Sequence, residues 1–299
     1  MWADQILQGI FLGGYYALIA CGLSFMFGVM RIVNLAHGSI AVLSAYVVWV
    51  VAEQWHLSPF LAMLLVLPVM AFAGWLLQRT ILERALRSGA LTPLLATFGL
   101  AVVIDNALFE RFGADTRSLA PDLGDLAFNS WNPTPDFAIG QFAVITLVPA
   151  IALLGGLQLF LNRTPLGRAI RATAEDPDTA ELVGIDSRKT YAAAAAIAIA
   201  TVAIAGTFLG MRATFDPYAG SAQLIFAFEA IVIGGTGSLW GTLIGGVVLG
   251  VAQNFGSQIS PQGFLIAGHL VFFVVLAARF FIAGRDPRTL LRALRKAPA

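Results

Sequence analysis

Long apolar runs recur along this chain and limit the folds open to it. Each run is about 20 residues long, which as a helix crosses the ~30 Å hydrocarbon core of a bilayer. Lipid offers no hydrogen bonds to free backbone groups, so such runs fold as helices. The sequence therefore predicts an all-α, polytopic membrane protein with about eight or nine transmembrane helices. The nine runs are residues 5–29, 34–52, 57–78, 92–110, 139–161, 190–212, 222–235, 239–257 and 263–283.

The seventh run, 222–235, is short for a crossing, so we expect it to be tilted, kinked or re-entrant. The pattern also permits eight or ten crossings. Composition agrees with burial in lipid: hydrophobic residues make up 58% of the chain and charged residues 12%, against roughly 25% charged in ordinary soluble domains. We expect a single transmembrane domain over residues 1–299. Its three polar segments are an outer loop at about 111–138, a loop at about 162–189 and a tail at about 284–299.

Basic residues gather on one side of the predicted membrane. With the N-terminus outside and nine crossings, 15 of the 18 basic residues face the inside, which the positive-inside rule favours. The C-terminus and the loop at 162–189 are then cytoplasmic. Those on the inside are Arg31, Arg79, Arg84, Arg87, Arg163, Arg168, Arg171, Arg188, Lys189, Arg279, Arg285, Arg288, Arg292, Arg295 and Lys296; Arg111, Arg117 and Arg212 lie outside. They form a membrane-edge belt rather than a patch, so no nucleic-acid partner is expected.

The loop at 162–189 carries the signals that start and stop helices. Thr164 before Pro165, and Asp176 before Pro177, each place a capping side chain ahead of a proline at the first helical position. Gly184 supplies a stop. We expect a short helix at 177–183, with Ala180 on its exposed face. Connections between antiparallel helices usually take two to eight residues, so a loop this long predicts a binding role; a solvated connector is the alternative.

Two polar, glycine-rich breaks interrupt the apolar runs, at 31–39 and 234–241. Irregular backbone at membrane depth is tolerated where it lines a cavity or is buried in protein, so the breaks favour a substrate pathway. A tight turn at the inner surface explains them equally well. The candidate path residues here are Asn34, His37, Gly38, Ser39, Gly235, Thr236, Gly237 and Ser238.

Glycines then recur every four residues after the second break. Gly237, Gly241 and Gly245 form one such series, and Gly246 and Gly250 form another pair. Small residues at this spacing let a neighbouring helix approach closely. We therefore assign Gly241 and Gly245 to helix packing.

Two acidic residues lie within predicted spans, Asp105 and Glu229. Ionisable groups are costly in lipid, so each indicates a pathway or a contact between helices. Asp105 lies near the outer end of its span, where an outer vestibule explains it. Glu229 lies deeper and joins the candidate path residues, with a structural hydrogen bond to another span as the alternative.

Signatures of catalysis and of metal or nucleotide binding are missing from the sequence. A phosphate-binding loop needs G-x-x-x-x-G-K-[ST], and the only lysine before Ser or Thr, Lys189, follows Arg188 instead of glycine. The histidines, His37, His56 and His269, are far apart in sequence and form no H-E-x-x-H motif. We therefore expect no catalytic residues, no metal site and no cofactor on this chain, with any ATP hydrolysed by a partner.

Three segments in order resemble the permeases of branched-chain amino-acid ABC transporters. Asn34-Leu35-Ala36-His37-Gly38 resembles the family's N-x-A-H-G motif, and the segment 234–241 is similar to its G-G-x-G-S-x-x-G motif. The third is similar to the family's ATPase-coupling loop, and its matching residues include Arg168, Arg171, Asp176, Ala180, Glu181, Leu182 and Gly184. In layout the chain looks more like the H-type than the M-type subunit.

The resemblance implies half of the translocation pathway of an ATP-driven importer in the bacterial inner membrane. The implied partners are a second permease subunit (M-type or a second copy), cytoplasmic ABC ATPase subunits and a periplasmic substrate-binding protein. The implied substrates are branched-chain or related small amino acids or amides. The alternative is a stand-alone, ion-coupled secondary transporter or channel, which would depend on an ion gradient rather than on an ATPase.

The predicted orientation can be tested by cysteine labelling. In a Cys21→Ser background, a cysteine at Asp122 should react with an impermeant reagent added to sealed cells. A cysteine at Asp178 should react only after the inner face is opened. Labelling at Asp178 in sealed cells would contradict the orientation.

Overall fold

The computed structural model describes residues 2–89, 91–127, 129–134 and 137–284, so the predicted tail after Gly284 lies outside the described residues. Within these residues, eight helices are long and apolar enough to cross a membrane. They are α1 (Trp2–Met30), α2 (His37–Trp55), the helix Pro59–Arg87, α5 (Thr92–Phe112), α6 (Gln141–Arg163), α9 (Ser187–Arg212), α11 (Leu239–Ile259) and α12 (Gly263–Gly284). The helix Pro59–Arg87 comprises α3 (Pro59–Leu77), a π-helical turn (Gln78–Leu82) and α4 (Glu83–Arg87). The prediction of an all-α polytopic membrane protein is confirmed.

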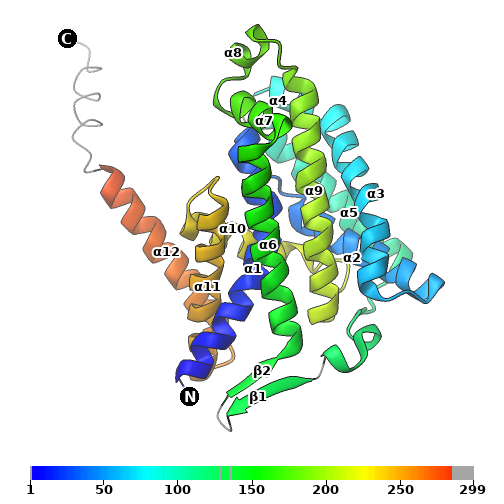
Figure 1. Cartoon of the computed structure of the whole chain (residues 1–299), viewed down its shortest axis with the longest axis vertical. Helices are drawn as coiled ribbons and strands as arrows, with labels where there is room; N and C mark the ends of the chain where they lie inside the picture. Colours follow the sequence, from blue (N-terminus) through cyan, green and yellow to red (C-terminus); the bar gives the residue numbers. More distant parts are fainter. Residues whose placement is uncertain (1, 90, 128, 135–136, 285–299) are drawn as a thin grey trace.

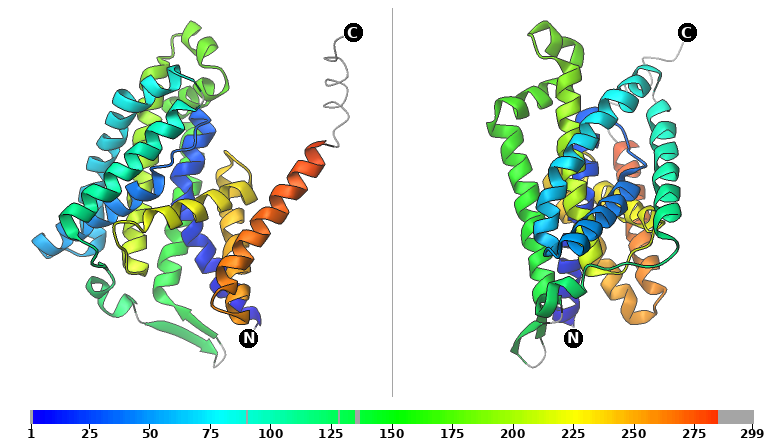
Figure 2. Two further views of the ribbon diagram at one scale, coloured as in Figure 1. Left: turned by 180° about the vertical axis from the view of Figure 1, so that it is seen from behind. Right: turned by 90° about the vertical axis from the view of Figure 1, so that its right-hand side faces the viewer.

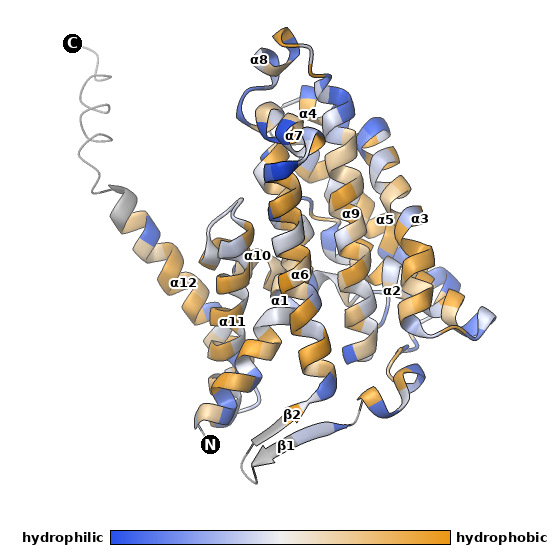
Figure 3. Ribbon diagram, viewed as in Figure 1, coloured by the Kyte–Doolittle hydropathy of each residue, from blue (hydrophilic) through white to orange (hydrophobic). Residues whose placement is uncertain are grey.

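Successive long helices run in alternating directions except for α9 and α11, which run the same way, so that the start of α1 and the end of α12 lie at opposite ends of the bundle (Figure 1). A small antiparallel hairpin, β1 (Ser130–Thr134) and β2 (Phe137–Gly140), follows a 3₁₀ turn, η2 (Pro121–Ala127), within the predicted outer loop. We call this end of the bundle the hairpin end. The opposite end carries α7 (Pro165–Glu175) and α8 (Pro177–Leu182), and we call it the α8 end. Hydrophilic residues gather at both ends, and hydrophobic ones cover the helices between them (Figure 3).

Helix α1 lies at the centre of the bundle, with most of its residues buried. Its antiparallel neighbour α11 approaches it at backbone contact distance. A Cβ added to Gly246 would lie 2.6 Å from the carbonyl oxygen of Gly13, and one added to Gly250 would lie 2.4 Å from that of Gly9. Helix α9 packs against α1, α2 and α3. Glycine and alanine on the facing surfaces let these helices approach one another closely.

A second face of α11 packs equally closely against α10 (Gly220–Gly234). A Cβ on Gly245 would lie 2.0 Å from the carbonyl oxygen of Ala230, and one on Gly241 would lie 2.3 Å from that of Gly234. These are the close backbone contacts that a packing role for Gly241 and Gly245 requires. The two glycine series therefore serve two partners, α10 and α1, within the same chain.

The seventh apolar run forms the short helix α10. Its 15 residues span about 22 Å, less than the ~30 Å hydrocarbon core. It is inclined to the long helices (Figure 2). It starts against the beginning of α2, because a Cβ on Gly38 would lie 1.9 Å from the carbonyl oxygen of Gly220.

The first break is a non-helical, re-entrant segment rather than a turn at the surface. After Met30 the chain turns back, and the Nε2 atom of His37 lies 2.7 Å from the carbonyl oxygen of Ile19. Ile19 is 11 residues before Met30 in α1, which corresponds to about 16 Å along the helix axis. Helix α2 therefore begins partway along α1, well inside the bundle.

The glycine contacts predict opposite effects for the same substitution at two sites. Gly245→Ala should destabilise the protein by about 1–3 kcal/mol, because the added methyl group overlaps the backbone of α10. Gly156→Ala on α6 meets open space and should leave stability unchanged or raise it by about 0.5–1 kcal/mol. Thermal unfolding of both variants in detergent measures the difference. Equal transitions would mean that the α10–α11 contact tolerates bulk.

Candidate functional site

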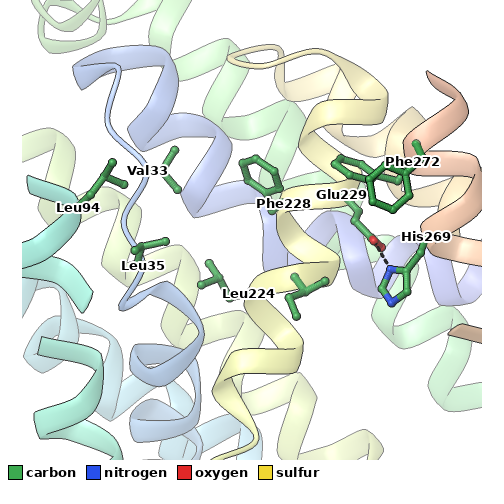
Figure 4. Close-up of a pocket in the computed structure, with 10 residues that line it drawn as sticks. Val33, Leu35, Leu94, Leu224, Phe228, Glu229, His269 and Phe272 are labelled. Atoms are coloured by element: carbon green, nitrogen blue, oxygen red, sulfur yellow. Dashed lines mark hydrogen bonds and ion pairs between the residues drawn. The ribbon is translucent and has the colours of Figure 1, made fainter. Parts of the chain in front are cut away.

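A groove of about 680 Å³ lies between α5, the first break, α10 and α12. Helix α10 forms one wall, and the non-helical segment before α2 faces it (Figure 4). The lining residues are Val33, Leu35, Leu94, Leu224, Ile225, Phe228, Glu229, His269, Phe272 and Phe273. All but Glu229 and His269 are apolar. The groove therefore suits a small ligand that combines an apolar body with one polar group.

The non-helical segment between α1 and α2 sends some side chains into the groove and others into the bundle. It has no regular secondary structure at residues 31–34 and a turn at residues 35–36, where the backbone N–H of His37 donates to the carbonyl oxygen of Asn34 at 3.1 Å. Val33 and Leu35 line the groove, whereas Asn34 is fully buried, with its Nδ2 atom 3.8 Å from the sulfur of Met26 on α1. There the Asn34 Oδ1 atom accepts a hydrogen bond of 3.0 Å from the backbone N–H of Ala36.

The other candidates from the first break are also buried inside the subunit. His37 bonds to the backbone of α1, and Gly38 packs on the start of α10. Ser39 is buried, with 3% of the residue exposed. None of Asn34, His37, Gly38 and Ser39 is among the residues that line the groove. In this structure they hold the break in place, and a direct role in the pathway stays a prediction.

The second break, at 235–238, is a tight turn toward the α8 end. Gly235 and Gly237 have φ values of 104° and 82°, which favour glycine. Ser238 caps α11, accepting a hydrogen bond of 3.0 Å from the backbone N–H of Gly241. Thr236 is exposed. None of Gly235, Thr236, Gly237 and Ser238 lines the groove, so their role in the pathway is also still a prediction.

Glu229 is the candidate path residue that lies in the groove. Its side chain is buried, with 3% of the residue exposed, and its Oε1 atom hydrogen-bonds to the Nδ1 atom of His269 on α12. Its second oxygen, Oε2, is buried without a hydrogen-bond partner among the described residues. The expected hydrogen bond between Glu229 and another helix is confirmed. The residue also lines the groove, and its role in the pathway stays a prediction.

Sequence reasoning gave His269 no role at this site. The signal was present, because a histidine inside an apolar run is as unusual as the acid it pairs with. Its partner is 40 residues away in sequence, and no local spacing rule joins residues so far apart. Only the packing of α10, α11 and α12 brings the two side chains together.

The loop at 162–189 has the predicted capping. The Thr164 hydroxyl accepts from the backbone N–H of Gly167 at 2.9 Å. The Asp176 carboxylate accepts from the backbone N–H groups of Asp178 and Thr179, both at 3.1 Å. The Thr179 hydroxyl also donates to Asp176, and this bond is the main reason that the pKa of Asp176 is lowered. Gly184, at φ 87°, follows the end of α8.

The expectation that Ala180 lies exposed on this short helix is wrong. Only 3% of Ala180 is exposed, because α8 folds back on α7 and α9. Leu182 and Val183 at the end of α8 are 86% and 74% exposed instead. Arg168, Arg171 and Glu181 are exposed as well. The apolar surface that this loop offers is therefore Leu182 and Val183.

The Glu229–His269 pair predicts a non-additive response to substitution, because Glu229 is buried. His269→Leu should destabilise the protein by about 1–3 kcal/mol, because it leaves the Glu229 carboxylate buried without its donor. The double variant Glu229→Leu/His269→Leu should be closer to the wild type in stability, since no polar group is then left unpaired. A double-mutant cycle from denaturant unfolding tests this. Additive single and double effects would show that the two side chains do not interact.

With the geometry established, comparison with known proteins places the chain. The model of the family described as "Branched-chain amino acid transport system / permease component" matches residues 5–279. The permease protein BraD of a high-affinity branched-chain amino acid transport system in Pseudomonas aeruginosa is 30% identical, over 95% of this chain and 96% of its own length. The corresponding LivH of Escherichia coli is 30% identical over 94% and 95%. A probable LivH of Methanocaldococcus jannaschii is 29% identical over 93% and 90%.

No solved structure matches this chain significantly. The family model covers most of the chain, including all the long helices and the groove. The groove residues and the loop with α7 and α8 thus all fall within the matched region. The chain belongs to the family of permease components of branched-chain amino acid transport systems.

Proposed function

We propose that this chain is the H-type membrane subunit of an ATP-driven importer for branched-chain or related small amino acids, and that the groove is its half of the pathway. The observation that carries the proposal is the groove itself, which has apolar walls and one ionisable pair, Glu229 and His269. Leucine, isoleucine and valine combine a branched apolar side chain with charged groups at one end. The groove offers a matching division between apolar and polar walls.

A second permease subunit, either M-type or a second copy, would close the groove into a passage. The groove lies between α5 and α12, and both helices expose large apolar side chains beside it. Examples are Phe98 on α5 and Phe273 on α12, at 57% and 63% exposed. A helix from a partner laid across this face would cover them.

The α8 end is proposed to face the cytoplasm of a bacterial inner membrane. Of the 13 basic residues that the structure describes, ten are those assigned to the inside, and they lie toward the α8 end. Arg111, Arg117 and Arg212 lie toward the hairpin end. The positive-inside rule then leaves the hairpin end for a periplasmic binding protein.

The α8 element is proposed as the contact for a cytoplasmic ABC ATPase. Asp176 and Gly184 define its two ends, and Leu182 and Val183 project from it into solvent. Two large apolar side chains exposed at the tip of a polar loop are typical of a binding surface. ATP would be bound and hydrolysed by that partner.

The stand-alone, ion-coupled transporter remains a second candidate because the Glu229–His269 pair lies in the proposed pathway. Ionisable pairs inside membranes can relay protons. Uptake into proteoliposomes distinguishes the two. Uptake by the importer requires ATP and the ATPase and does not change when the proton gradient is dissipated. Uptake by the ion-coupled transporter stops when the gradient is dissipated.

The ATPase contact is tested by Leu182→Asp. The new charge would be buried in the interface, so ATPase association should weaken by about tenfold or more, as for loss of an interface hot spot. Glu175→Gln, an exposed change at the end of α7, is the matched control and should leave association unchanged. Pull-down of the ATPase and ATP hydrolysis in liposomes measure the effect. If the Leu182→Asp variant bound the ATPase as the wild type does, this loop would be a connector and not the ATPase contact.

A further inference from the structure

We infer that the Oε2 atom of Glu229 is the acceptor for the ammonium group of a zwitterionic amino acid in the groove, so that this chain carries a substrate subsite of its own. The inference deepens the proposed function and rests on it. It assigns a chemical task to an oxygen atom that the fold leaves unpartnered.

The first observation is the state of the Glu229 carboxylate. The residue is 3% exposed, and its Oε2 atom has no hydrogen-bond partner among the described residues. A buried polar atom without a partner is costly. The cost is removed when a ligand brings a donor, and a donor with a positive charge suits a carboxylate best.

The second observation is the way His269 holds the carboxylate. Its Nδ1 atom, on the facing helix α12, hydrogen-bonds to Oε1 (Figure 4). Oε1 therefore has a partner within the chain, and Oε2 has none among the described residues. His269 is then a positioning residue: it fixes the direction in which Oε2 points. The pair joins the two helices that form one side of the groove.

The third observation is the apolar surface next to the pair. Ile225 precedes Glu229 by one helical turn, so both lie on one face of α10. Phe272 and Phe273 follow His269 by three and four residues on α12, and all three line the groove. An ammonium group at Oε2 would therefore place a branched aliphatic side chain against Ile225 and the two phenylalanines.

The same lining argues against other ligands. A hard cation such as Ca²⁺ takes six or more oxygen ligands, and the lining side chains supply only the two oxygens of one carboxylate. A ligand whose only charged group is a carboxylate would be repelled by the negative charge of Glu229. A sugar needs many hydrogen-bond partners, and apolar walls provide none. An ammonium group on a small apolar body fits both the charge and the walls.

Equilibrium binding separates these ligands. The complex that co-purifies with the tagged chain is placed in nanodiscs without its binding protein and titrated with three probes. The probes are L-leucine, 3-methylbutylamine, which lacks the carboxylate, and 4-methylpentanoate, which lacks the ammonium group. Leucine and 3-methylbutylamine should bind and compete with each other. 4-Methylpentanoate should not compete.

Three variants test the residues. Glu229→Gln keeps the shape of the side chain but loses its charge, so leucine should bind about tenfold or more weakly, the loss expected of a hydrogen bond to a charged group. His269→Leu should also weaken binding, while His269→Asn, whose amide can replace the Nδ1 donor, should retain it. Glu175→Gln makes the same change of charge outside the groove and should bind as the wild type does. Melting temperatures of all four complexes show that they are folded.

Unchanged leucine affinity in Glu229→Gln would overturn the inference, and so would equal competition by 4-methylpentanoate or a wild-type complex that binds no leucine. ATP-driven uptake of leucine by the same wild-type complex with its binding protein tests the proposed function separately. If that uptake is present and the binding results are negative, the subsite alone is wrong. If no branched-chain amino acid is taken up, the proposed function is wrong.

Discussion

Helix α11 contacts α1 on one face and α10 on another through glycine backbone, and the positions of the other functional elements depend on these two contacts. Lipid exerts no hydrophobic force that drives helices together, so close van der Waals packing must hold them. Gly246 and Gly250 meet Gly13 and Gly9 of α1, while Gly245 meets Ala230 of α10. Helix α11 thereby fixes the short, inclined α10 against the central helix. Because α10 carries Glu229, the same packing sets the depth of the ionisable pair.

The re-entrant segment solves a problem that the short helix creates. An inclined helix of 15 residues is too short to cross the bilayer alone, and the non-helical segment 31–36 lies beside it across the groove. Non-helical backbone inside a membrane protein needs partners for its polar groups. Asn34 bonds to the backbone N–H of Ala36, and the side chain of His37 bonds to the carbonyl group of Ile19. The polar residues of this motif thus stabilise the segment whose apolar residues, Val33 and Leu35, line the groove.

Local features of the fold could be predicted from the sequence, and contacts between distant residues could not. Apolar runs long enough to cross a bilayer predicted the helices, and glycines spaced four residues apart predicted the packing face of Gly241 and Gly245. Asp176 and Gly184 marked the ends of α8, because caps and stops act on the neighbouring turn of the chain. The burial of Ala180 was not predicted, because it depends on how α8 folds back on α7 and α9. The sequence of the six-residue helix α8 alone does not indicate this packing. Asn34 and Leu35 are neighbours in sequence, yet Leu35 lines the groove and Asn34 is buried in the bundle.

Helix α12 is the most exposed of the long helices; it packs along α11 and, less extensively, against α10. His269 bonds to Glu229, and ten residues later Arg279 donates to the carbonyl oxygen of Ile233 at 3.1 Å. Ten residues of helix span about 15 Å, so these two polar contacts hold α12 to α10 at well-separated points, one beside the groove and one at the end of α10. At the hairpin end, Gly256 and Gly263 approach at backbone distance where α11 passes into α12. With so little buried apolar surface, the position of α12 depends on these contacts, and the width of the groove depends on the position of α12. A ligand that engages Glu229 therefore acts on the same carboxylate that holds this wall of the groove in place.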